Sequence, residues 1–269
     1  MINYNGSMMS KNQDILNRGF KYGDSVFDTI KVINKKIIFS EDHYFRLMAS
    51  MRMLRMEIPL DFTLEYYEQE IFRSIDSNNL KDARVRVNVY RSGAGAYLPE
   101  TNEIDFVIEV FPLIENNKDN YIVDLYKDYY NYSGVLSTIK TNNRVINTLS
   151  NIYAEENNLD SCILLNENKH VCETINGNIF LVKDDKIITP SIDQGCIKGV
   201  VRKKLIELIQ KIPNYTIEER AVSPFELQKV DEVFITNSIV DIQPITNYRK
   251  KVYSTKVSSV LKANLKTLY

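Results

Sequence analysis

A polar run near the middle of the chain, residues 114–120, most constrains how this sequence can fold. It reads Ile-Glu-Asn-Asn-Lys-Asp-Asn, and short β-prone runs and amphipathic helical patterns occur on both sides of it. Domain boundaries fall in polar linkers of this kind. The 269 residues give room for two modest domains, each with its own core. We therefore predict an N-terminal domain at residues 1–116 and a C-terminal domain at residues 117–269.

The composition is that of a globular protein without a polyanionic partner. Apolar residues make up 44% of the chain, and the 34 basic and 35 acidic residues nearly cancel, so nucleic-acid binding is disfavoured. No apolar run approaches the roughly 20 residues of a membrane span. The first residues have neither the basic region nor the apolar core of a signal peptide. We expect neither nucleic acid nor membrane as a partner.

Cysteine and histidine usage argues against metal and disulfide chemistry. Cys162, Cys172 and Cys196 are odd in number and form no Cys-x-x-Cys pair, so a disulfide framework or a zinc site is not expected. His43 and His170 show no metal-ligand spacing. The prediction is a protein of the reducing cytoplasm that binds no metal.

Lys140 is the first candidate for chemistry. The β-prone run at residues 132–139 predicts a strand that ends at this lysine, and an amphipathic helix is expected from about residue 147. A lysine over a pocket is desolvated, which lowers its pKa and frees its amine to react with a carbonyl. Most lysines are solvated, so the position alone is weak support.

Further features raise the weight of Lys140. Glu173 follows an apolar run and needs a cationic or protonated partner if it is buried. The predicted helix start at residues 199–201 would offer free N–H groups to a phosphate, and Ser238 and Arg46 could donate further hydrogen bonds. Pyridoxal phosphate would use all of these: Lys140 for its aldehyde, Glu173 for its pyridine nitrogen and the helix start for its phosphate. The bound cofactor acts as an electron sink.

The strand predicted at residues 83–91 allows two interpretations. Valines alternate along it with Arg84, Arg86, Asn88 and Tyr90. A half-buried strand with a polar outer face explains this pattern, but two arginines and a tyrosine on one face could also bind a carboxylate.

The motifs resemble the class IV, or fold type IV, pyridoxal-phosphate enzymes. This family includes branched-chain aminotransferases, D-amino acid aminotransferases and aminodeoxychorismate lyases. The similarity runs from Arg-Gly-Phe-Lys-Tyr-Gly-Asp at residues 18–24, through Lys-Thr-Asn-Asn-Arg at 140–144, to Asp-Ile-Gln-Pro-Ile at 241–245. The resemblance implies an α/β fold of two domains, with a larger C-terminal pseudo-barrel, a cofactor between the domains and a homodimer.

The resemblance also implies roles for individual residues. Lys140 is similar to the Schiff-base lysine, Glu173 to the partner of the pyridine nitrogen, and Arg46 to a phosphate-binding arginine. The other expected cofactor contacts are Asn178, Gly199, Val200, Val201 and Ser238. Two positions depart from the family pattern: Gly177 stands where serine is usual, and Val201 replaces a threonine of the phosphate turn. The lost hydroxyl predicts somewhat weaker phosphate binding.

The substrate is less constrained. Tyr22, Phe27 and Arg86 resemble substrate-side positions of branched-chain aminotransferases, whereas Arg91 falls where D-amino acid aminotransferases bind a carboxylate. Ile239 is a further expected substrate contact, and the motif at residues 237–239 resembles the lyases.

Three hypotheses follow from these motifs. The leading one is an aminotransferase that moves an amino group, most readily from a branched-chain or other hydrophobic amino acid, to a 2-oxo acid. The second is an aminodeoxychorismate lyase that forms 4-aminobenzoate and pyruvate. The third is a non-catalytic cofactor-binding or structural protein on an enzyme fold.

Overall fold

The computed structural model describes residues 1–9, 17–114 and 117–269. The chain divides into two compact units: unit 1 comprises Met1–Glu115 with Ile139–Asn143, and unit 2 comprises Asn116–Thr138 with Arg144–Tyr269. Residues 115 and 116 of the predicted boundary lie outside the described residues, so the boundary stays a prediction. The short segment Ile139–Asn143 belongs to unit 1, although the residues on both sides of it belong to unit 2.

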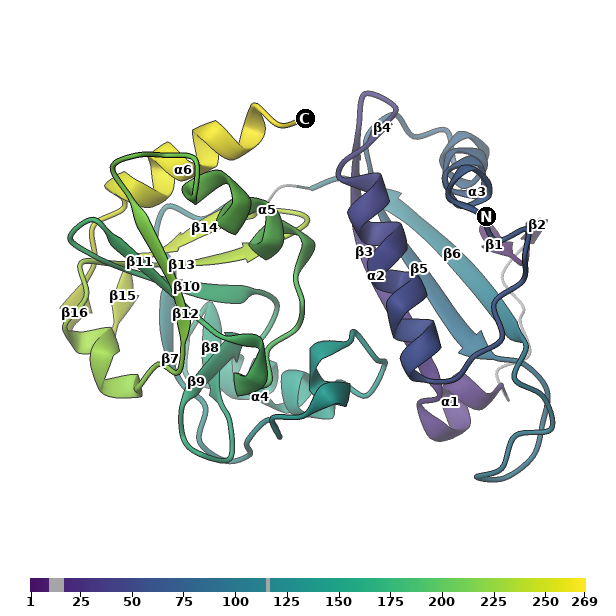
Figure 1. Cartoon of the computed structure of the whole chain (residues 1–269), viewed down its shortest axis with the longest axis horizontal. Coiled ribbons are helices and arrows are strands. Elements are labelled where there is room, and N and C mark those ends of the chain that lie inside the picture. The colour runs from purple at the N-terminus through teal and green to yellow at the C-terminus, as the bar shows by residue number, and fades with distance from the viewer. Residues whose placement is uncertain (10–16, 115–116) are drawn as a thin grey trace. The chain divides into compact units, whose positions relative to one another are not determined.

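Unit 1 is a mixed α/β unit. Its sheet has the order β2-β1-β6-β5-β3-β4 within the described residues, and every pair of neighbouring strands is antiparallel. Figure 1 shows α2 along β3. The elements of unit 1 are β1 (Ile2–Tyr4), β2 (Ser7–Met9), α1 (Arg18–Tyr22), β3 (Ser25–Ile33), β4 (Lys36–Ile37), α2 (Ser40–Met53), α3 (Leu64–Ser77), β5 (Ala83–Arg91) and β6 (Ile104–Pro112).

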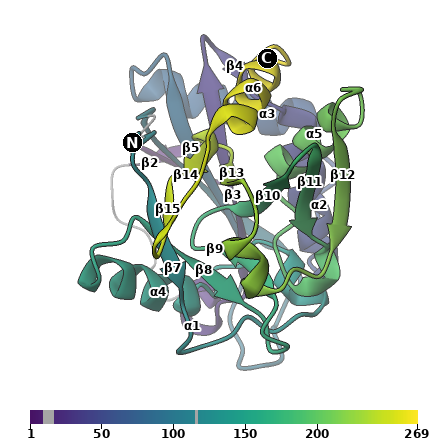
Figure 2. The same ribbon diagram turned by 90° about the vertical axis from the view of Figure 1, so that its left-hand side faces the viewer.

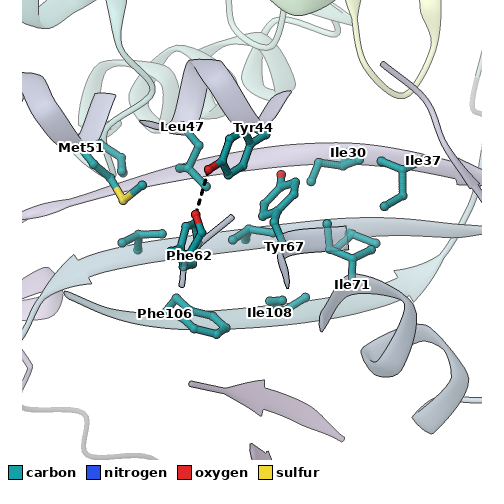
Figure 3. Packing of buried hydrophobic residues seen from close by; sticks show 14 of the residues in the cluster. Ile30, Ile37, Tyr44, Leu47, Met51, Phe62, Tyr67, Ile71, Phe106 and Ile108 are labelled. Carbon is teal, nitrogen blue, oxygen red and sulfur yellow. Dashed lines mark hydrogen bonds between the residues drawn. The ribbon is translucent and has the colours of Figure 1, made fainter. Parts of the chain in front are cut away.

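The core of unit 1 lies between one face of this sheet and the two long helices. Val85, Val87 and Val89 alternate along β5 and are all fully buried in it, which confirms the predicted strand pattern. Figure 3 shows side chains of α2 and α3 packed against this face. The Tyr44 hydroxyl donates a hydrogen bond of 2.8 Å to the carbonyl of Phe62, so its polar end is satisfied inside the core.

Unit 2 contains two five-stranded sheets within the described residues. Their orders are β12-β11-β10-β13-β14 and β16-β15-β7-β8-β9, and Figure 2 shows β12 beside β11 at one sheet edge. The elements are β7 (Ile122–Leu125), α4 (Val145–Glu156), β8 (Ser161–Leu165), β9 (Val171–Thr174), β10 (Asn178–Lys183), β11 (Lys186–Pro190), α5 (Val200–Ile209), β12 (Thr216–Arg220), β13 (Glu232–Asn237), β14 (Asp241–Ile245), β15 (Asn247–Tyr248), β16 (Lys251–Val252), α6 (Lys256–Lys266) and the 3₁₀ turns η1 (Val135–Thr138), η2 (Ile192–Gln194) and η3 (Pro224–Gln228).

The two sheets of unit 2 share one core. Val123 and Ile163 of one sheet and Ile179 and Val233 of the other belong to the same buried cluster. The helices α5 and α6 both contact β13. This arrangement agrees with the predicted barrel-like C-terminal part, and both units confirm the predicted α/β class.

The strand predicted at residues 132–139 is wrong. This region contains η1 and no strand before Ile139. The Ser137 hydroxyl donates to the carbonyl of Gly134 at 2.6 Å, and the Thr138 hydroxyl donates to that of Val135 at 2.8 Å. Such local bonds offer the backbone an alternative to strand pairing, which the β propensity of the sequence does not reveal.

Candidate active site

Lys140 is held by the sheet of unit 1. The backbone N–H of Phe27 donates to the carbonyl of Lys140 at 2.8 Å, and the N–H of Asn142 donates to the carbonyl of Ser25 at 3.2 Å. A bridge between Val26 and Thr141 completes this short antiparallel contact with β3. The sequence therefore delivers Lys140 to β3 rather than placing it at the end of its own strand.

A glycine before β3 lets this segment approach closely. Gly23 has φ of 63°, and a β-carbon there would overlap the side-chain oxygen of Asn143. The Asn143 amide donates to the carbonyl of Gly23 at 3.3 Å. Any other residue at position 23 would displace the Asn143 side chain and strain the backbone at this positive φ.

Phe27 brings Lys140 and Arg86 together. The Lys140 Nζ lies 4.5 Å from the centroid of the Phe27 ring, and the Arg86 Cζ lies 3.8 Å from the same centroid. The Phe27 ring is 8% exposed. Six residues predicted for the site belong to unit 1: Tyr22, Phe27, Arg46, Arg86, Arg91 and Lys140. The structure places two of them, Lys140 and Arg86, against the ring of a third, Phe27.

The Arg86 guanidinium is oriented by two amides. Its Nε donates to the Oδ1 of Asn88 at 3.1 Å, and its Nη2 donates to the Oδ1 of Asn142 at 3.0 Å. Asn88 donates in turn to Glu109 at 3.4 Å. Burial lowers the pKa of Arg86 against the opposing charge of Glu109, but an arginine remains protonated. The result is a half-buried cation with no carboxylate bound to it among the described residues.

Arg91 lies in different surroundings. Its Nε donates to Asp24 at 2.9 Å, its Nη1 donates to Asn102 at 2.6 Å, and its Nη2 donates to the carbonyl of Leu54 at 2.6 Å. Longer bonds to the Arg55 carbonyl and to Asp24 use its two remaining N–H groups. All five donors of this buried guanidinium are therefore occupied within unit 1.

Tyr22, the remaining predicted substrate contact of unit 1, lies at the end of α1. The Arg18 Cζ is 4.8 Å from its ring centroid, and Tyr97 packs against it with centroids 6.0 Å apart. Arg18 also donates to three successive carbonyls of the loop at residues 94–96. The side chain of Tyr22 is 40% exposed, so solvent reaches this part of unit 1.

Arg46, the predicted phosphate contact, pairs with a buried carboxylate. Both oxygens of Asp28 accept hydrogen bonds from its guanidinium, and the His43 Nδ1 lies 3.1 Å from the same carboxylate. Burial raises the pKa of Asp28, but the charges and hydrogen bonds of Arg46 and His43 outweigh it and hold that pKa well below its usual range. Asp28 thus fixes Arg46 on the inner side of α2.

Glu173 is buried in unit 2, as predicted. Its Oε2 accepts a hydrogen bond of 2.9 Å from the backbone N–H of Ile197, and the side chain is 4% exposed. Arg144 supplies a nearby positive charge. Burial lowers the pKa of Arg144, and the charge of Glu173 opposes that shift. The buried carboxylate therefore has the cationic neighbour that it needs.

The start of α5 is shaped for close approach. Gly199 precedes the helix, no side chain caps it, and a β-carbon at this position would overlap the side-chain oxygen of Asn178. The Asn178 amide donates to the Ile197 carbonyl at 2.8 Å. The first N–H groups of α5, at Val200 and Val201, are therefore not used by a capping side chain, which suits an anion.

Strand packing explains why residue 177 is a glycine. A β-carbon at this position would lie 2.7 Å from the backbone carbonyl of Thr236 on β13, too close for any side chain. Here β10 and β13 begin their pairing, with Asn178 opposite Thr236. The departure from the usual serine therefore permits the close approach of β10 and β13.

The turn after β13 holds the last two predicted contacts. The Oδ1 of Asn237 accepts hydrogen bonds from the N–H groups of Ile239 at 2.9 Å and of Val240 at 3.1 Å. This fixes the turn that contains Ser238 and Ile239, both half-buried.

These groups fit pyridoxal phosphate by the chemistry of their donors. A lysine amine, a buried carboxylate beside a cation and an uncapped helix start have the chemistry to bind an aldehyde, a pyridine nitrogen and a phosphate. Lys140 belongs to unit 1, whereas Glu173 and Gly199 belong to unit 2. Within the described residues no cluster of histidine, cysteine or acidic side chains could hold a metal ion, and no helix is long and apolar enough to cross a membrane.

Sequence reasoning assigned no role to Asn142 or Asp28. Asn142 lies inside the lysine motif, but its contact with Arg86 joins residues far apart in sequence. Asp28 alternates with Val26 and Ile30 on the buried face of β3, and a lone acidic residue in that pattern was the available signal.

Comparison with known proteins gives several relatives. The chain is 28% identical over 86% of its length to a branched-chain-amino-acid aminotransferase-like protein of Arabidopsis thaliana, and it spans 42% of that protein. It is 25% identical to a D-alanine aminotransferase of Bacillus licheniformis, covering 98% of this chain and 94% of that one. An aminodeoxychorismate lyase of Vibrio harveyi is 26% identical over 85% of this chain and 84% of its own.

Solved structures agree on the fold. The branched-chain aminotransferase of Thermoproteus uzoniensis with norvaline matches with a TM-score of 0.90 and 18% identity, over 99% of this chain and 93% of that one. The pyridoxal-phosphate form of the Thermobaculum terrenum branched-chain aminotransferase matches with a TM-score of 0.86 and 22% identity, over 99% and 92% of the two chains. Both neighbours have the fold predicted here.

The family itself follows from a match to the pattern of a whole protein family. Residues 25–248, well over half of the chain, fit the sequence pattern described as amino-transferase class IV. This stretch contains the lysine motif, the Glu173 strand and the start of α5. The chain is therefore an enzyme that belongs to the class IV aminotransferase family.

Proposed function

We propose that this enzyme is a pyridoxal-phosphate-dependent aminotransferase that moves an amino group from an amino acid to a 2-oxo acid. The observation that carries the proposal is the arrangement around Phe27. An amine suited to react with a carbonyl and a guanidinium suited to bind a carboxylate lie against the same ring, Lys140 at 4.5 Å and Arg86 at 3.8 Å from its centroid. An α-amino acid carries both groups that this pair recognises.

Pyridoxal phosphate is the proposed cofactor, and the contacts assigned to it follow the resemblance of the motifs to the family. Lys140 is assigned to its aldehyde, Glu173 to its pyridine nitrogen, and Arg46 to its phosphate. The remaining assigned contacts are Asn178, Gly199, Val200, Val201 and Ser238. When bound, the cofactor supplies an electron sink for the α-carbon of the substrate.

The residues of the chain orient the substrate and move its proton. Lys140 takes the proton from the substrate α-carbon, and such transfer by a positioned group contributes about 10²- to 10⁴-fold to the rate. Arg86 holds the substrate carboxylate through charge-assisted hydrogen bonds. Phe27 covers both groups and keeps water away from them, which strengthens their electrostatic interactions. Arg91 is not assigned to the carboxylate, because its five donors are already occupied.

Branched-chain or other hydrophobic amino acids are the proposed donors. Phe27 offers an apolar wall, and Tyr22 and Ile239 are assigned to the substrate side chain. The branched-chain aminotransferase-like relative from Arabidopsis, with 28% identity, supports this choice. A homodimer in a reducing cytoplasm is proposed as well, and the three free, buried cysteines are compatible with that compartment.

An aminodeoxychorismate lyase is the second candidate. The similarity to the Vibrio harveyi enzyme, over 85% of this chain, favours it. The lyase would use the same lysine and cofactor but release pyruvate without needing a 2-oxo acid acceptor. Pyruvate release from aminodeoxychorismate in the absence of an acceptor therefore separates the two candidates.

The test is amino transfer by the cofactor-loaded protein with a panel of L- and D-amino acids and 2-oxoglutarate. We expect hydrophobic donors to give the corresponding 2-oxo acids, and the best donor defines handedness and side-chain class. Lys140→Ala should abolish both turnover and the visible absorbance of the lysine-bound cofactor. Lys211→Ala, which removes an exposed lysine after α5, is the matched control and should change neither.

Two outcomes contradict the proposal. Retained turnover in Lys140→Ala would remove the lysine assignment. A wild-type protein that stays colourless with added cofactor would favour the non-catalytic reading.

A further inference from the structure

Arg86 differs from the other buried arginines of unit 1 in the charge of its partners. Arg18 and Arg91 pair with Asp24, and Arg46 pairs with Asp28. The two side chains that accept hydrogen bonds from Arg86, Asn88 and Asn142, are neutral amides. A buried guanidinium without a carboxylate keeps its full charge for an incoming anion.

The carboxylate opposite Arg86 in the sheet accepts a hydrogen bond from a neighbouring residue and not from Arg86. Glu109 lies opposite Arg86 in the pairing of β5 with β6, but its oxygen accepts from Asn88 at 3.4 Å. Asn88 thereby turns its own carbonyl oxygen toward Arg86. Among the described residues no acceptor takes the Nη1 group of Arg86, so this end of the fork is available to a ligand.

Asn142 connects Arg86 to the lysine segment. Its side chain accepts from the Arg86 Nη2 at 3.0 Å, while its backbone N–H donates to Ser25 on β3 at 3.2 Å. It lies two residues after Lys140. Because the Arg86 Cζ and the Lys140 Nζ lie 3.8 and 4.5 Å from the same ring centroid, they are at most about 8.3 Å apart.

Two groups this close can act on one small acid. A proton-transfer contact of about 3 Å from Nζ to the α-carbon and a charge-assisted hydrogen bond of about 2.8 Å from Arg86 to the carboxylate need only a single carbon–carbon bond between the α-carbon and the carboxylate carbon. Such a site requires a hydrogen-bond acceptor that orients the Arg86 guanidinium without neutralising its charge. An amide oxygen meets this need, and a carboxylate in its place would compete with the substrate.

We propose that Asn142 is a positioning residue that orients Arg86 toward the substrate carboxylate. Because the side chain of Asn142 is a neutral amide, the positive charge of Arg86 stays available to that carboxylate. The inference rests on the proposed role of Arg86 in carboxylate binding. It predicts that the affinity for carboxylates depends on the charge of residue 142, whereas the affinity for uncharged analogues does not.

The test is calorimetric binding of two non-reacting ligands to the cofactor-loaded protein: isocaproate, which carries a carboxylate, and isocaproamide, which does not. We expect Asn142→Asp to weaken isocaproate binding about 10- to 100-fold, since one charge-assisted hydrogen bond is lost to an internal ion pair. Asn142→Ala should weaken it by less, because Arg86 loses its orientation but keeps its charge. Isocaproamide binding should change less than about twofold in both variants.

The control is Asn151→Asp, which adds the same charge on an exposed position of α4 and should leave both affinities unchanged. Wild-type isocaproate affinity in Asn142→Asp overturns the proposal. An equal loss for both ligands also overturns it, because that result reports a displaced lysine segment. If Asn142→Asp does not fold, an unchanged isocaproate affinity in Asn142→Ala overturns the proposal, and a selective loss supports it.

The binding result is independent of turnover. If no amino acid is transaminated and Asn142→Asp still weakens isocaproate selectively, the proposed reaction fails and the role of Asn142 stands.

Discussion

Arg86 and Arg91 lie five residues apart on the same strand, β5, but their side chains have different roles. Arg91 is 7% exposed, and all five of its donors are used, two of them by Asp24. Arg86 is half-buried, is held by two amides and stacks on Phe27. Arg91 ties the end of β5 to the segments around it, whereas Arg86 keeps its charge for a ligand.

The comparison shows that the charge of its hydrogen-bond partners determines the role of a buried arginine. A guanidinium that meets a carboxylate and several carbonyls contributes to stability, and removing either partner leaves an uncompensated charge. A guanidinium that meets only amides is oriented but not neutralised, so its binding energy remains for an anion. This contrast can be tested at both residues.

The largest effect is expected for a substitution of Asp24, which forms ion pairs with two arginines. Asp24→Asn leaves Arg18 and Arg91 without their shared carboxylate, and we expect a loss of about 3–5 kcal/mol in the free energy of unfolding. Urea unfolding followed by circular dichroism measures it. The control is Asp128→Asn, at an exposed position of unit 2. A loss below about 1 kcal/mol would mean that the Arg91 cluster is not structural.

The pH dependence of stability also distinguishes the two kinds of arginine. A carboxylate partner is protonated at low pH, whereas an amide partner does not titrate. The pKa of Asp28 lies below its unfolded value, so its stabilising contribution is complete above about pH 4 and is lost as pH falls toward the folded pKa. For a carboxyl shifted in this way the contribution is on the order of 2–3 kcal/mol. Asp28→Asn should therefore be less stable than wild type at pH 6, and the difference should narrow by pH 3.

Unfolding midpoints in urea at the two pH values check this prediction. A stability difference that is equal at pH 6 and pH 3 would contradict the assigned direction of the shift.

Substitution of Arg86 should affect substrate binding and leave stability almost unchanged. Arg86→Met removes the ligand-binding charge but leaves no buried acid unpaired, so the free energy of unfolding should change by less than about 1 kcal/mol. The KM for carboxylate substrates should rise about 10- to 100-fold, since a charge-assisted hydrogen bond contributes about 1.5–3 kcal/mol. Steady-state kinetics and urea unfolding of the same variant are compared. A stability loss as large as that of Asp24→Asn would erase the distinction between the two arginines.

The sequence predicted much of this site and could not predict the rest. The motif around Lys140 and the alternation along β5 indicated Lys140, Phe27 and Arg86, because both signals are local. The strand predicted before Lys140 was wrong, because Ser137 and Thr138 bond to nearby carbonyls instead.

The roles of the two arginines were beyond local reasoning. Asp24 is 67 residues from Arg91, and Asn142 is 56 residues from Arg86. Contacts at such separations come from the sheet register and from the return of the lysine segment to β3, and neither is encoded in the residues next to an arginine.

The smallest expected effect tests whether geometry adds to charge at Arg86. Arg86→Lys keeps the charge, but an ammonium on a flexible stem cannot donate in a fixed fork to Asn88 and Asn142 together. We expect KM for carboxylate substrates to rise only about threefold to tenfold, between wild type and Arg86→Met, with stability unchanged. Pairing Arg86→Lys with Asn142→Ala decides the cause: if the two amides act by orienting the fork, the second change adds little once the fork is gone. Full additivity of the two effects would instead show that Asn142 acts on the substrate by another route.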